Sequence, residues 1–270
     1  MANKSNKANI GIFGLGNMGR AIFKFLRQGQ TGQRLIFFIY SLDLKRIRNA
    51  VCLNSLAELT KKCDIIFLCI KPQDFYNLKS LKANHKIFIS IMAGVNIKNI
   101  KKIINSPNII RVMPNLPLQV GRGVIAWRTG AAKLTKNQFN LIKKLFSAFG
   151  YNFKVKTEDD LNKITAISGS GPAYIFLFID ALTKAAENLG FAPKQAEEMV
   201  LELLEGSLAY FKSVKNIYTP GQLINMVKSK KGTTEAALNK LNTAKFYKSW
   251  RLAINQAYKR AGQISDYEIK

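Results

Sequence analysis

Three glycines near the start of the chain have the spacing of a loop that can bind a dinucleotide. Gly14, Gly16 and Gly19 follow an apolar run that ends at Phe13 and precede a helical stretch over Arg20–Arg27. In such a loop the first glycine allows a tight turn, the second lets the backbone approach a pyrophosphate, and the third lets the helix pack on the strand. The pyrophosphate would meet the N–H groups and the dipole of the helix N-terminus. The pattern predicts a dinucleotide site, although a glycine turn can also be purely structural.

A second stretch with possible chemistry lies far downstream. A loop that begins at Ser229 ends at Gly232, and Thr233 and Thr234 follow where a helix is expected to start. Threonine is a common N-cap, so one interpretation is that these residues only cap the helix. The other is that the exposed amides bind a substrate carboxylate while a threonine hydroxyl points into the same pocket. The residues alone leave both interpretations open.

Chemistry based on histidine or metal ions is largely excluded by composition. His85 is the single histidine, and its polar surroundings predict an exposed loop side chain. A histidine triad or a multi-histidine metal site is excluded unless His85 itself serves. Cys52, Cys63 and Cys69 lack metal-ligand spacing and are typical of small apolar side chains in a reducing compartment. We expect no metal site.

The overall composition predicts a globular, cytoplasmic protein of two domains. The chain has 270 residues, of which 47% are hydrophobic. Its net charge of +26 could indicate nucleic-acid binding. The basic residues are spread along the chain, however, and the abundance of Lys, Asn, Ile and Phe is what AT-rich coding would give. We therefore expect no nucleic-acid partner.

No membrane partner is expected either. The polar stretch Met1–Asn9 does not resemble a signal peptide. The longest apolar stretch, Ala173–Ile179, is too short to span a bilayer.

The glycine loop must be positioned by the alternating strands and helices of the first part of the chain. This alternation predicts a parallel sheet covered on both faces, in an α/β, Rossmann-type dinucleotide-binding domain over residues 1–160. After the first strand, the expected strands span residues 35–40, 63–70, 86–91, 109–112, 123–127 and 151–155, with a helix over residues 136–149.

The end of the second strand bears on the choice of cofactor. Ser41 can donate to a 2′-phosphate, and Lys45 and Arg46 follow. An acid at this place would instead accept the ribose hydroxyls of NAD. Asp43 lies past that place and could cap the next helix. The pattern favours NADPH, with NADH as the second option.

No strand is expected after Glu158, and residues 161–270 are predicted to form an all-α dimerisation domain. Its first helix is interrupted at Ser168–Pro172, either for a close backbone approach or as a kink. The next stretch, Ala173–Leu182, is apolar nearly all round, and such a helix must be buried on every side. A helical region of this size cannot bury it alone, so we infer a partner subunit.

Three further motifs lie behind the glycine loop. Met113-Pro-Asn-Leu-Pro117, Ser168-Gly-Ser-Gly-Pro-Ala-Tyr174 and Gly232-Thr-Thr234, in this order, resemble pyrroline-5-carboxylate reductase. The resemblance runs from about Ile10 to about Leu238. It implies an NAD(P)H-dependent oxidoreductase acting on a CH–NH group, which transfers hydride to C5 of the cyclic imine 1-pyrroline-5-carboxylate and gives L-proline, the last step of proline biosynthesis. It also implies dimers through interlaced C-terminal helices, often assembled into decamers.

The resemblance further implies which residues form the site. The threonine loop would hold the substrate carboxylate through Ser229, Gly232, Thr233 and Thr234. Thr234 would be the catalytic residue, orienting the ring nitrogen by a hydrogen bond without acting as a general acid. The positions that match the family's cofactor-lining residues are Phe13, Gly14, Leu15, Gly16, Asn17, Met18, Ser41, Asn54, Cys69, Ile70, Lys71, Pro72, Ile91, Met92 and Ala93.

Two features of the threonine loop bear on substrate affinity. The family usually reads Ser-Pro-Gly-Gly before the threonines, whereas this chain has Lys230 and Lys231 in the two middle positions. The change alters the rigidity of the loop and adds two positive charges near the carboxylate site. Glu235 suits the helix dipole, yet it would repel a carboxylate if it faced the pocket.

Two alternative functions remain open at this stage. One is a β-hydroxyacid dehydrogenase or an imine reductase of similar build. The lysine and asparagine that the dehydrogenase would need on the first interdomain helix do not occur at the required spacing over Ser168–Glu187. The other is a basic nucleic-acid-binding protein that keeps the fold.

Overall fold

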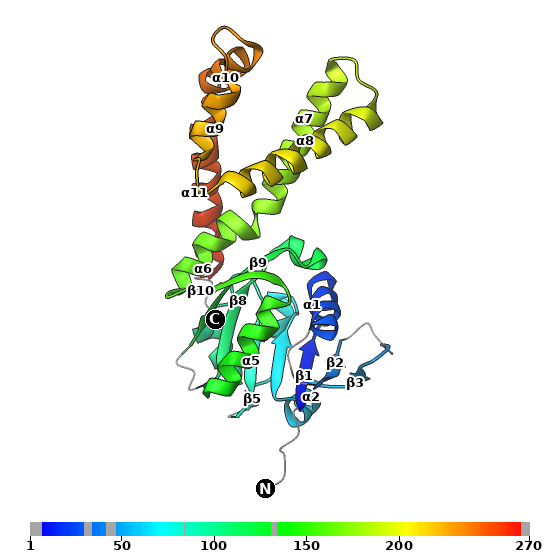
Figure 1. The fold of residues 1–270 in the computed structure, drawn as a ribbon. Helices are drawn as coiled ribbons and strands as arrows, with labels where there is room; N and C mark the ends of the chain where they lie inside the picture. Colours follow the sequence, from blue (N-terminus) through cyan, green and yellow to red (C-terminus); the bar gives the residue numbers. More distant parts are fainter. Residues whose placement is uncertain (1–6, 30–33, 42–46, 84, 131–133, 266–270) are drawn as a thin grey trace. The chain divides into compact units, whose positions relative to one another are not determined.

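The computed structural model describes residues 7–29, 34–41, 47–83, 85–130 and 134–265. Two compact units make up the chain (Figure 1). The first unit combines residues 1–172 with residues 256–270, and the second comprises residues 173–255. The predicted division of function near residue 160 stays a prediction.

An eight-stranded sheet forms the centre of the first unit, in the order β10-β9-β8-β6-β4-β1-β2-β3. β1 pairs in parallel with β2 on one side and with β4 on the other. The carboxyl ends of β1 and β4 therefore flank the switch point at which α/β sheets bind ligands. The strands are β1 (Lys7–Phe13), β2 (Arg34–Tyr40), β3 (Val51–Cys52), β4 (Ile65–Leu68), β6 (Ile87–Ser90), β8 (Ile109–Met113), β9 (Gly123–Thr129) and β10 (Gly150–Lys154), while β5 (Leu81–Lys82) and β7 (Ile104–Asn105) form a separate two-stranded sheet.

One edge of the sheet differs from the prediction of a parallel sheet. β9 runs antiparallel to β8, with Met113 opposite Ala126, and β10 pairs in parallel with β9. The connection explains the reversal, because it is only the short 3₁₀ helix η1 (Leu116–Val120) and a turn at Gly121, whose φ is 70°. A parallel pair would need a longer crossover connection. The wholly parallel arrangement was therefore wrong at this edge.

Helices cover both faces of the sheet, as predicted. Side chains alternate along β4, so Ile65 and Phe67 pack with α1 and α5, whereas Ile66 and Leu68 pack with α2, α3 and α4. In Figure 1, α5 lies across the strands. The helices are α1 (Asn17–Gln28), α2 (Leu56–Lys62), α3 (Pro72–Tyr76), α4 (Ile97–Ile103) and α5 (Lys136–Ser147).

Among the described residues after β10, helices are the only regular elements, joined by short turns and loops, which confirms the predicted all-α region. The predicted interruption at Ser168–Pro172 is confirmed only in part, because the irregular segment is a π-helical turn, η2, over Thr165–Gly169 within a continuous helix. Ser170 N–H donates to the carbonyl of Thr165 at 2.8 Å, the wider spacing of a π turn. The helices are α6 (Glu158–Ile164), η2 (Thr165–Gly169), α7 (Gly171–Asn188), α8 (Pro193–Val214), α9 (Pro220–Val227), α10 (Thr233–Thr243) and α11 (Phe246–Ser265).

The second unit exposes much apolar surface in the single chain. On α7, Ile175 and Phe176 are each 55% exposed and Leu177 is 68% exposed. The continuous helix Glu158–Asn188 is long and apolar enough to cross a membrane by length and composition alone, with a mean hydropathy of 1.3 in its most apolar window. Only 6% of that window is buried in the single chain. An apolar surface of this extent is also what a subunit interface leaves uncovered in one chain.

Candidate active site

The three glycines of the loop differ in what surrounds them, and the fold itself requires glycine at two of the three positions. Gly14 has a φ of 93°, a conformation that L side chains rarely adopt. A Cβ on Gly19 would lie 2.2 Å from the carbonyl oxygen of Gly14, so α1 approaches the loop too closely for a side chain. A Cβ on Gly16 would meet no atom within 4 Å. The loop therefore keeps open space beside Gly16.

The amino end of α1 suits an anionic group at that space. Gly16 is the N-cap of α1, and no side chain caps the helix. The first amides of a helix lack partners within the helix and favour negative charge. The glycine loop and the helix start thus fit the pyrophosphate of a dinucleotide.

A first cavity of about 300 Å³ lies at the carboxyl ends of β1, β2 and β4. The rings of Phe13 and Tyr40 stack there, with 5.0 Å between their centroids. Ser41, at the end of β2, also lines this cavity, which places it where an adenosine ribose would lie. Asp43, Lys45 and Arg46 lie outside the described residues. The cavity is lined by Phe13, Gly14, Leu15, Gly16, Tyr40, Ser41, Cys69, Ile70, Lys71, Asp74 and Leu78.

A second cavity of about 430 Å³ shares Gly16 and the Cys69–Lys71 segment with the first. It extends toward the carboxyl ends of β6 and β8, where the nicotinamide end of a dinucleotide would lie if its adenosine occupied the first cavity. The cavity is lined by Gly16, Asn17, Met18, Cys69, Ile70, Lys71, Pro72, Ile91, Met92, Ala93, Met113, Pro114, Asn115, Leu116 and Gly169.

Together the two cavities bring together every predicted cofactor residue except Asn54. Asn54 lies just before α2, and its backbone N–H donates to the Glu58 carboxylate at 3.2 Å. The part of each residue in cofactor binding stays a prediction.

Several lining residues were missed at the sequence level. The Met113–Leu116 segment and Gly169 belong to the two motifs quoted for the family resemblance, but no role was assigned to either. A signal was available, because Met113 ends β8 and ligands collect beyond the carboxyl ends of the strands in such sheets. In the first cavity, Tyr40 and Asp74 were missed in the same way.

The threonine loop, in the second unit, has a different cap from the one expected. Gly232 is the N-cap of α10, so Thr233 and Thr234 are its first two helical residues. The threonines therefore do not cap the helix, and their role in substrate binding stays a prediction. The Gly232 N–H donates to the Ser229 carbonyl at 3.0 Å, and a Cβ on Gly232 would lie 2.2 Å from the Ser229 hydroxyl. Only glycine fits there without a shift of Ser229.

The carboxylate of Glu235 points back to this loop. It accepts a hydrogen bond of 2.7 Å from the backbone N–H of Lys231. Lys231 has a φ of 60°, the left-handed conformation that glycine adopts more readily. The side chain of Glu235 is thus engaged with the loop backbone, and this contact holds Lys231 in its strained conformation.

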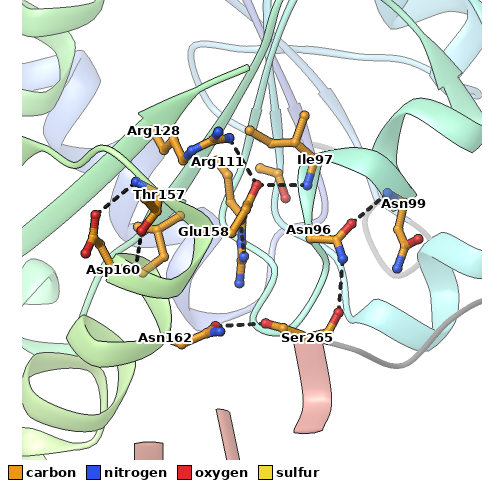
Figure 2. A network of polar contacts seen from close by, with 12 residues as sticks. Asn96, Ile97, Asn99, Arg111, Arg128, Thr157, Glu158, Asp160, Asn162 and Ser265 are labelled. Carbon is orange, nitrogen blue, oxygen red and sulfur yellow. Dashed lines mark hydrogen bonds and ion pairs between the residues drawn. The ribbon is translucent and has the colours of Figure 1, made fainter. Parts of the chain in front are cut away.

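A polar network anchors the start of α6 to the sheet (Figure 2). The Glu158 carboxylate accepts from the guanidinium groups of Arg111 on β8 and Arg128 on β9, and from the Ile97 N–H at the start of α4. Arg111 is 2% exposed, so its charge depends on this partner. The arrangement fixes α6 to three elements of the first unit.

The end of α11 joins the same network (Figure 2). The Ser265 hydroxyl donates to the Asn162 side-chain oxygen at 2.8 Å, and the Asn96 amide donates to the Ser265 carbonyl at 3.0 Å. About two turns earlier on α11, the Tyr258 hydroxyl donates to Asp159 at 2.6 Å. The last turns of α11 are therefore tied to both α6 and the start of α4.

The remaining candidates for acid–base or metal chemistry contribute little. His85 is exposed, as predicted. Cys69 lines both cavities, but burial raises the pKa of its thiol, which keeps it protonated at neutral pH. Burial, assisted by Asp64, also raises the pKa of Cys63 to about 12. The residues that the structure describes include no cluster of three or more His, Cys, Asp or Glu that could hold a metal ion.

Comparisons with known proteins agree with this geometry. A family model described as pyrroline-5-carboxylate reductase dimerisation matches residues 158–264, and one described as NADP oxidoreductase coenzyme F420-dependent matches residues 9–94. A pyrroline-5-carboxylate reductase from Aquifex aeolicus is 31% identical over 261 residues, which cover 94% of this chain and 97% of the relative.

Solved structures agree over nearly the full length. The 1-pyrroline-5-carboxylate reductase from Streptococcus pyogenes has a TM-score of 0.84 and 29% identity, over 95% of this chain and 99% of that one. The pyrroline carboxylate reductase from Plasmodium falciparum, solved with NADP bound, has a TM-score of 0.83 and 27% identity, over 97% of this chain and 100% of that one. These matches favour the predicted reductase over the alternative functions. By sequence and by structure, this chain belongs to the pyrroline-5-carboxylate reductase family.

Proposed function

We propose that the protein reduces 1-pyrroline-5-carboxylate to L-proline with NADPH, and that its glycine loop and threonine loop each bind one of the two reactants. As a member of this family it is an NAD(P)H-dependent oxidoreductase acting on a CH–NH group. The observation that carries the proposal is the pair of cavities beside Gly16, because they gather nearly all the predicted cofactor residues.

The cofactor end of the reaction is assigned to the first unit. The amides at the start of α1 bind the pyrophosphate beside Gly16, and Ser41 donates to the 2′-phosphate. The relative from Plasmodium falciparum, which has NADP bound, supports this choice of cofactor. When bound, the nicotinamide supplies a hydride from its C4 to C5 of the imine.

The substrate end of the reaction is assigned to the start of α10. Its first amides and the loop from Ser229 to Gly232 hold the substrate carboxylate. The Thr234 hydroxyl hydrogen-bonds the ring nitrogen and fixes the ring orientation. The imine is most reactive when its nitrogen is protonated, and substrate and solvent can supply that proton. The protein then accelerates the reaction mainly by positioning.

The oligomer is assigned to the exposed apolar helices. The match to a dimerisation domain supports a homo-oligomer, and we propose a cytoplasmic dimer that can assemble further into a decamer. Light scattering tests this, because each chain has a mass of 30.3 kDa. A particle of at least two chains is expected, and a stable single chain would contradict the assignment.

The decisive experiment follows the absorbance of reduced nicotinamide with 1-pyrroline-5-carboxylate, once with NADPH and once with NADH. We expect oxidation that depends on the imine and is faster with NADPH. Faster oxidation of NADH would overturn the cofactor preference alone. No oxidation of either cofactor would overturn the function. In that case, salt-sensitive binding of random duplex DNA would support the nucleic-acid alternative.

A further inference from the structure

Asn115 links the turn after β8 to the π-helical segment η2. Its side-chain amide donates to the Ser168 hydroxyl at 3.1 Å. Its side-chain oxygen accepts from the backbone N–H of Val124 on β9 at 2.8 Å. Asn115 is 8% exposed, and both of its bonds are partly buried. One buried side chain therefore fixes η2 relative to two strands of the sheet.

The two segments that Asn115 joins form one wall of the second cavity. Met113, Asn115 and Gly169 all line that cavity. The contact between the segments is close, since a Cβ on Gly169 would lie 2.7 Å from the methyl carbon of Met113. A shift of η2 would therefore change the shape of this wall.

The same two stretches of chain are joined at a second point. Arg111 comes shortly before Asn115 in the sequence and pairs with Glu158, which comes shortly before Ser168. The Arg111–Glu158 pair holds the start of α6, and the Asn115–Ser168 bond holds η2. A π turn breaks the regular hydrogen-bond ladder of a helix, so its position depends on such outside contacts.

From this geometry we propose that Asn115 is a positioning residue for hydride transfer, acting through its bond to Ser168 on the wall formed by η2. The inference rests on the proposed function, since it takes the second cavity as the nicotinamide end. The contacts of the first cavity do not include Asn115 or Ser168. Loss of the bond should thus affect the rate of reaction more than cofactor affinity.

The test is a double-mutant cycle with Asn115→Ala and Ser168→Ala, measured as kcat and as KM for each reactant. Each single change is expected to lower kcat by about ten-fold, since small misplacements at a reacting centre are costly. The KM for NADPH should change by less than about two-fold, because the adenosine contacts remain. The double variant should be no slower than the slower single one.

A matched control exists on the surface of the same unit. The side-chain amide of Asn152 donates to the Ser147 hydroxyl at 3.3 Å. This is also an asparagine–serine hydrogen bond, but neither residue lines either cavity. Asn152→Ala should leave kcat unchanged. A similar fall in kcat for this variant would show that loss of such a pair acts through general stability and would overturn the inference.

Other outcomes separate the inference from the proposed function. If the wild type is active and Asn115→Ala has the same kcat, the proposed role of Asn115 is overturned. The same holds if the effects of the two single changes on kcat simply add in the double variant. If Asn115→Ala does not fold, Ser168→Ala carries the test, because it leaves the bond to Val124 intact. Wild-type activity in Ser168→Ala would then overturn the inference. A wild type inactive with the imine would instead overturn the function itself.

Discussion

The carboxylate of Glu158, at the start of α6, is the ion-pair partner of Arg111, whose side chain is only 3% exposed within the sheet. The two partners differ in their dependence on the pair. Glu158 is 29% exposed and also accepts from Arg128 and from the Ile97 N–H. Among the described residues, Glu158 is the one carboxylate paired with Arg111.

This asymmetry predicts unequal costs of the two truncations. Glu158→Ala should lower the free energy of unfolding by about 3 kcal/mol, because it leaves a buried charge without its partner. Arg111→Met should cost about 1 kcal/mol, because Glu158 keeps its other donors and some solvent. Urea unfolding measures both. Glu198→Gln, in the exposed pair with Lys194 on α8, is the control and should change little. Equal costs at positions 111 and 158 would contradict the prediction.

The glycine loop predicts a separation of binding from folding. Gly16→Ala should weaken NADPH binding about ten-fold, equal to about 1.4 kcal/mol, with an unchanged Tm, since its Cβ would point into open space. Gly19→Ala should lower stability by about 1–3 kcal/mol, because its Cβ would meet the Gly14 carbonyl. Fluorescence titration and thermal unfolding separate the two effects. Gly262→Ala is the control, because a Cβ at Gly262 would also meet no atom within 4 Å. It should change NADPH affinity much less than Gly16→Ala does and Tm much less than Gly19→Ala does. A loss of Tm in Gly16→Ala equal to that in Gly19→Ala would refute this distinction.

Thr234→Ala tests the substrate end. It should lower turnover of 1-pyrroline-5-carboxylate at least several-fold and leave NADPH affinity nearly unchanged, because the hydroxyl is assigned to the ring nitrogen alone. Steady-state kinetics with each reactant varied provides the measurement. Thr243, whose hydroxyl donates to the Asn239 carbonyl at the other end of α10, supplies the control Thr243→Ala. Wild-type turnover in Thr234→Ala would remove this residue from the mechanism.

The bond between Glu235 and Lys231 predicts a rescue. Glu235→Ala should raise the KM for the imine, because Lys231 then holds its left-handed conformation without support. Adding Lys231→Gly should recover most of the loss, since glycine adopts a positive φ without strain. Kinetics of the two single variants and the double variant show this. If the double variant is as impaired as Glu235→Ala, backbone strain at position 231 is not the cause.

The contact between Tyr258 and Asp159 predicts a pH window for the docking of α11. Hydrogen bonds from Lys163 and Tyr258 lower the pKa of Asp159, and the bond to Asp159 raises the pKa of Tyr258. The Tyr258–Asp159 hydrogen bond therefore makes its full contribution to folding stability between the ordinary pKa values of the two groups, from about pH 4 to about pH 10. It is lost as the pH falls through the lowered pKa of Asp159 and as it rises through the raised pKa of Tyr258.

The measurement is the difference in Tm between the wild type and Tyr258→Phe as a function of pH. The difference should be constant near neutrality and shrink at both extremes. Tyr151→Phe, at an exposed tyrosine of β10, is the control and should show no such profile. A difference that stays constant through pH 11, above the ordinary tyrosine pKa of about 10, would contradict the prediction.

The form of the glycine loop could be predicted almost entirely from the sequence, because its physics is local. Gly14 is needed by the turn and Gly19 by the close packing of α1, whereas Gly16 leaves open space beside the helix start, and the spacing of the three expresses these demands directly. The exposure of His85 and the helical character of the last part of the chain were also predictable, from neighbouring residues and from periodicity. The family motifs added predictions for the cofactor residues and for the threonine loop.

Contacts between residues far apart in the chain were decided only by the tertiary structure. The reversal of β9 depended on a short connection whose geometry no periodicity encodes, and the N-cap of α10 proved to be Gly232. No sequence pattern pairs Arg111 with Glu158 or Asn115 with Ser168, because such pairs depend on how sheet and helix pack. The sequence by itself determined which cofactor class and reaction to expect, since short motifs carry those. Packing decided which side chains hold the motifs in place, since burial and hydrogen-bond partners exist only once the chain has folded.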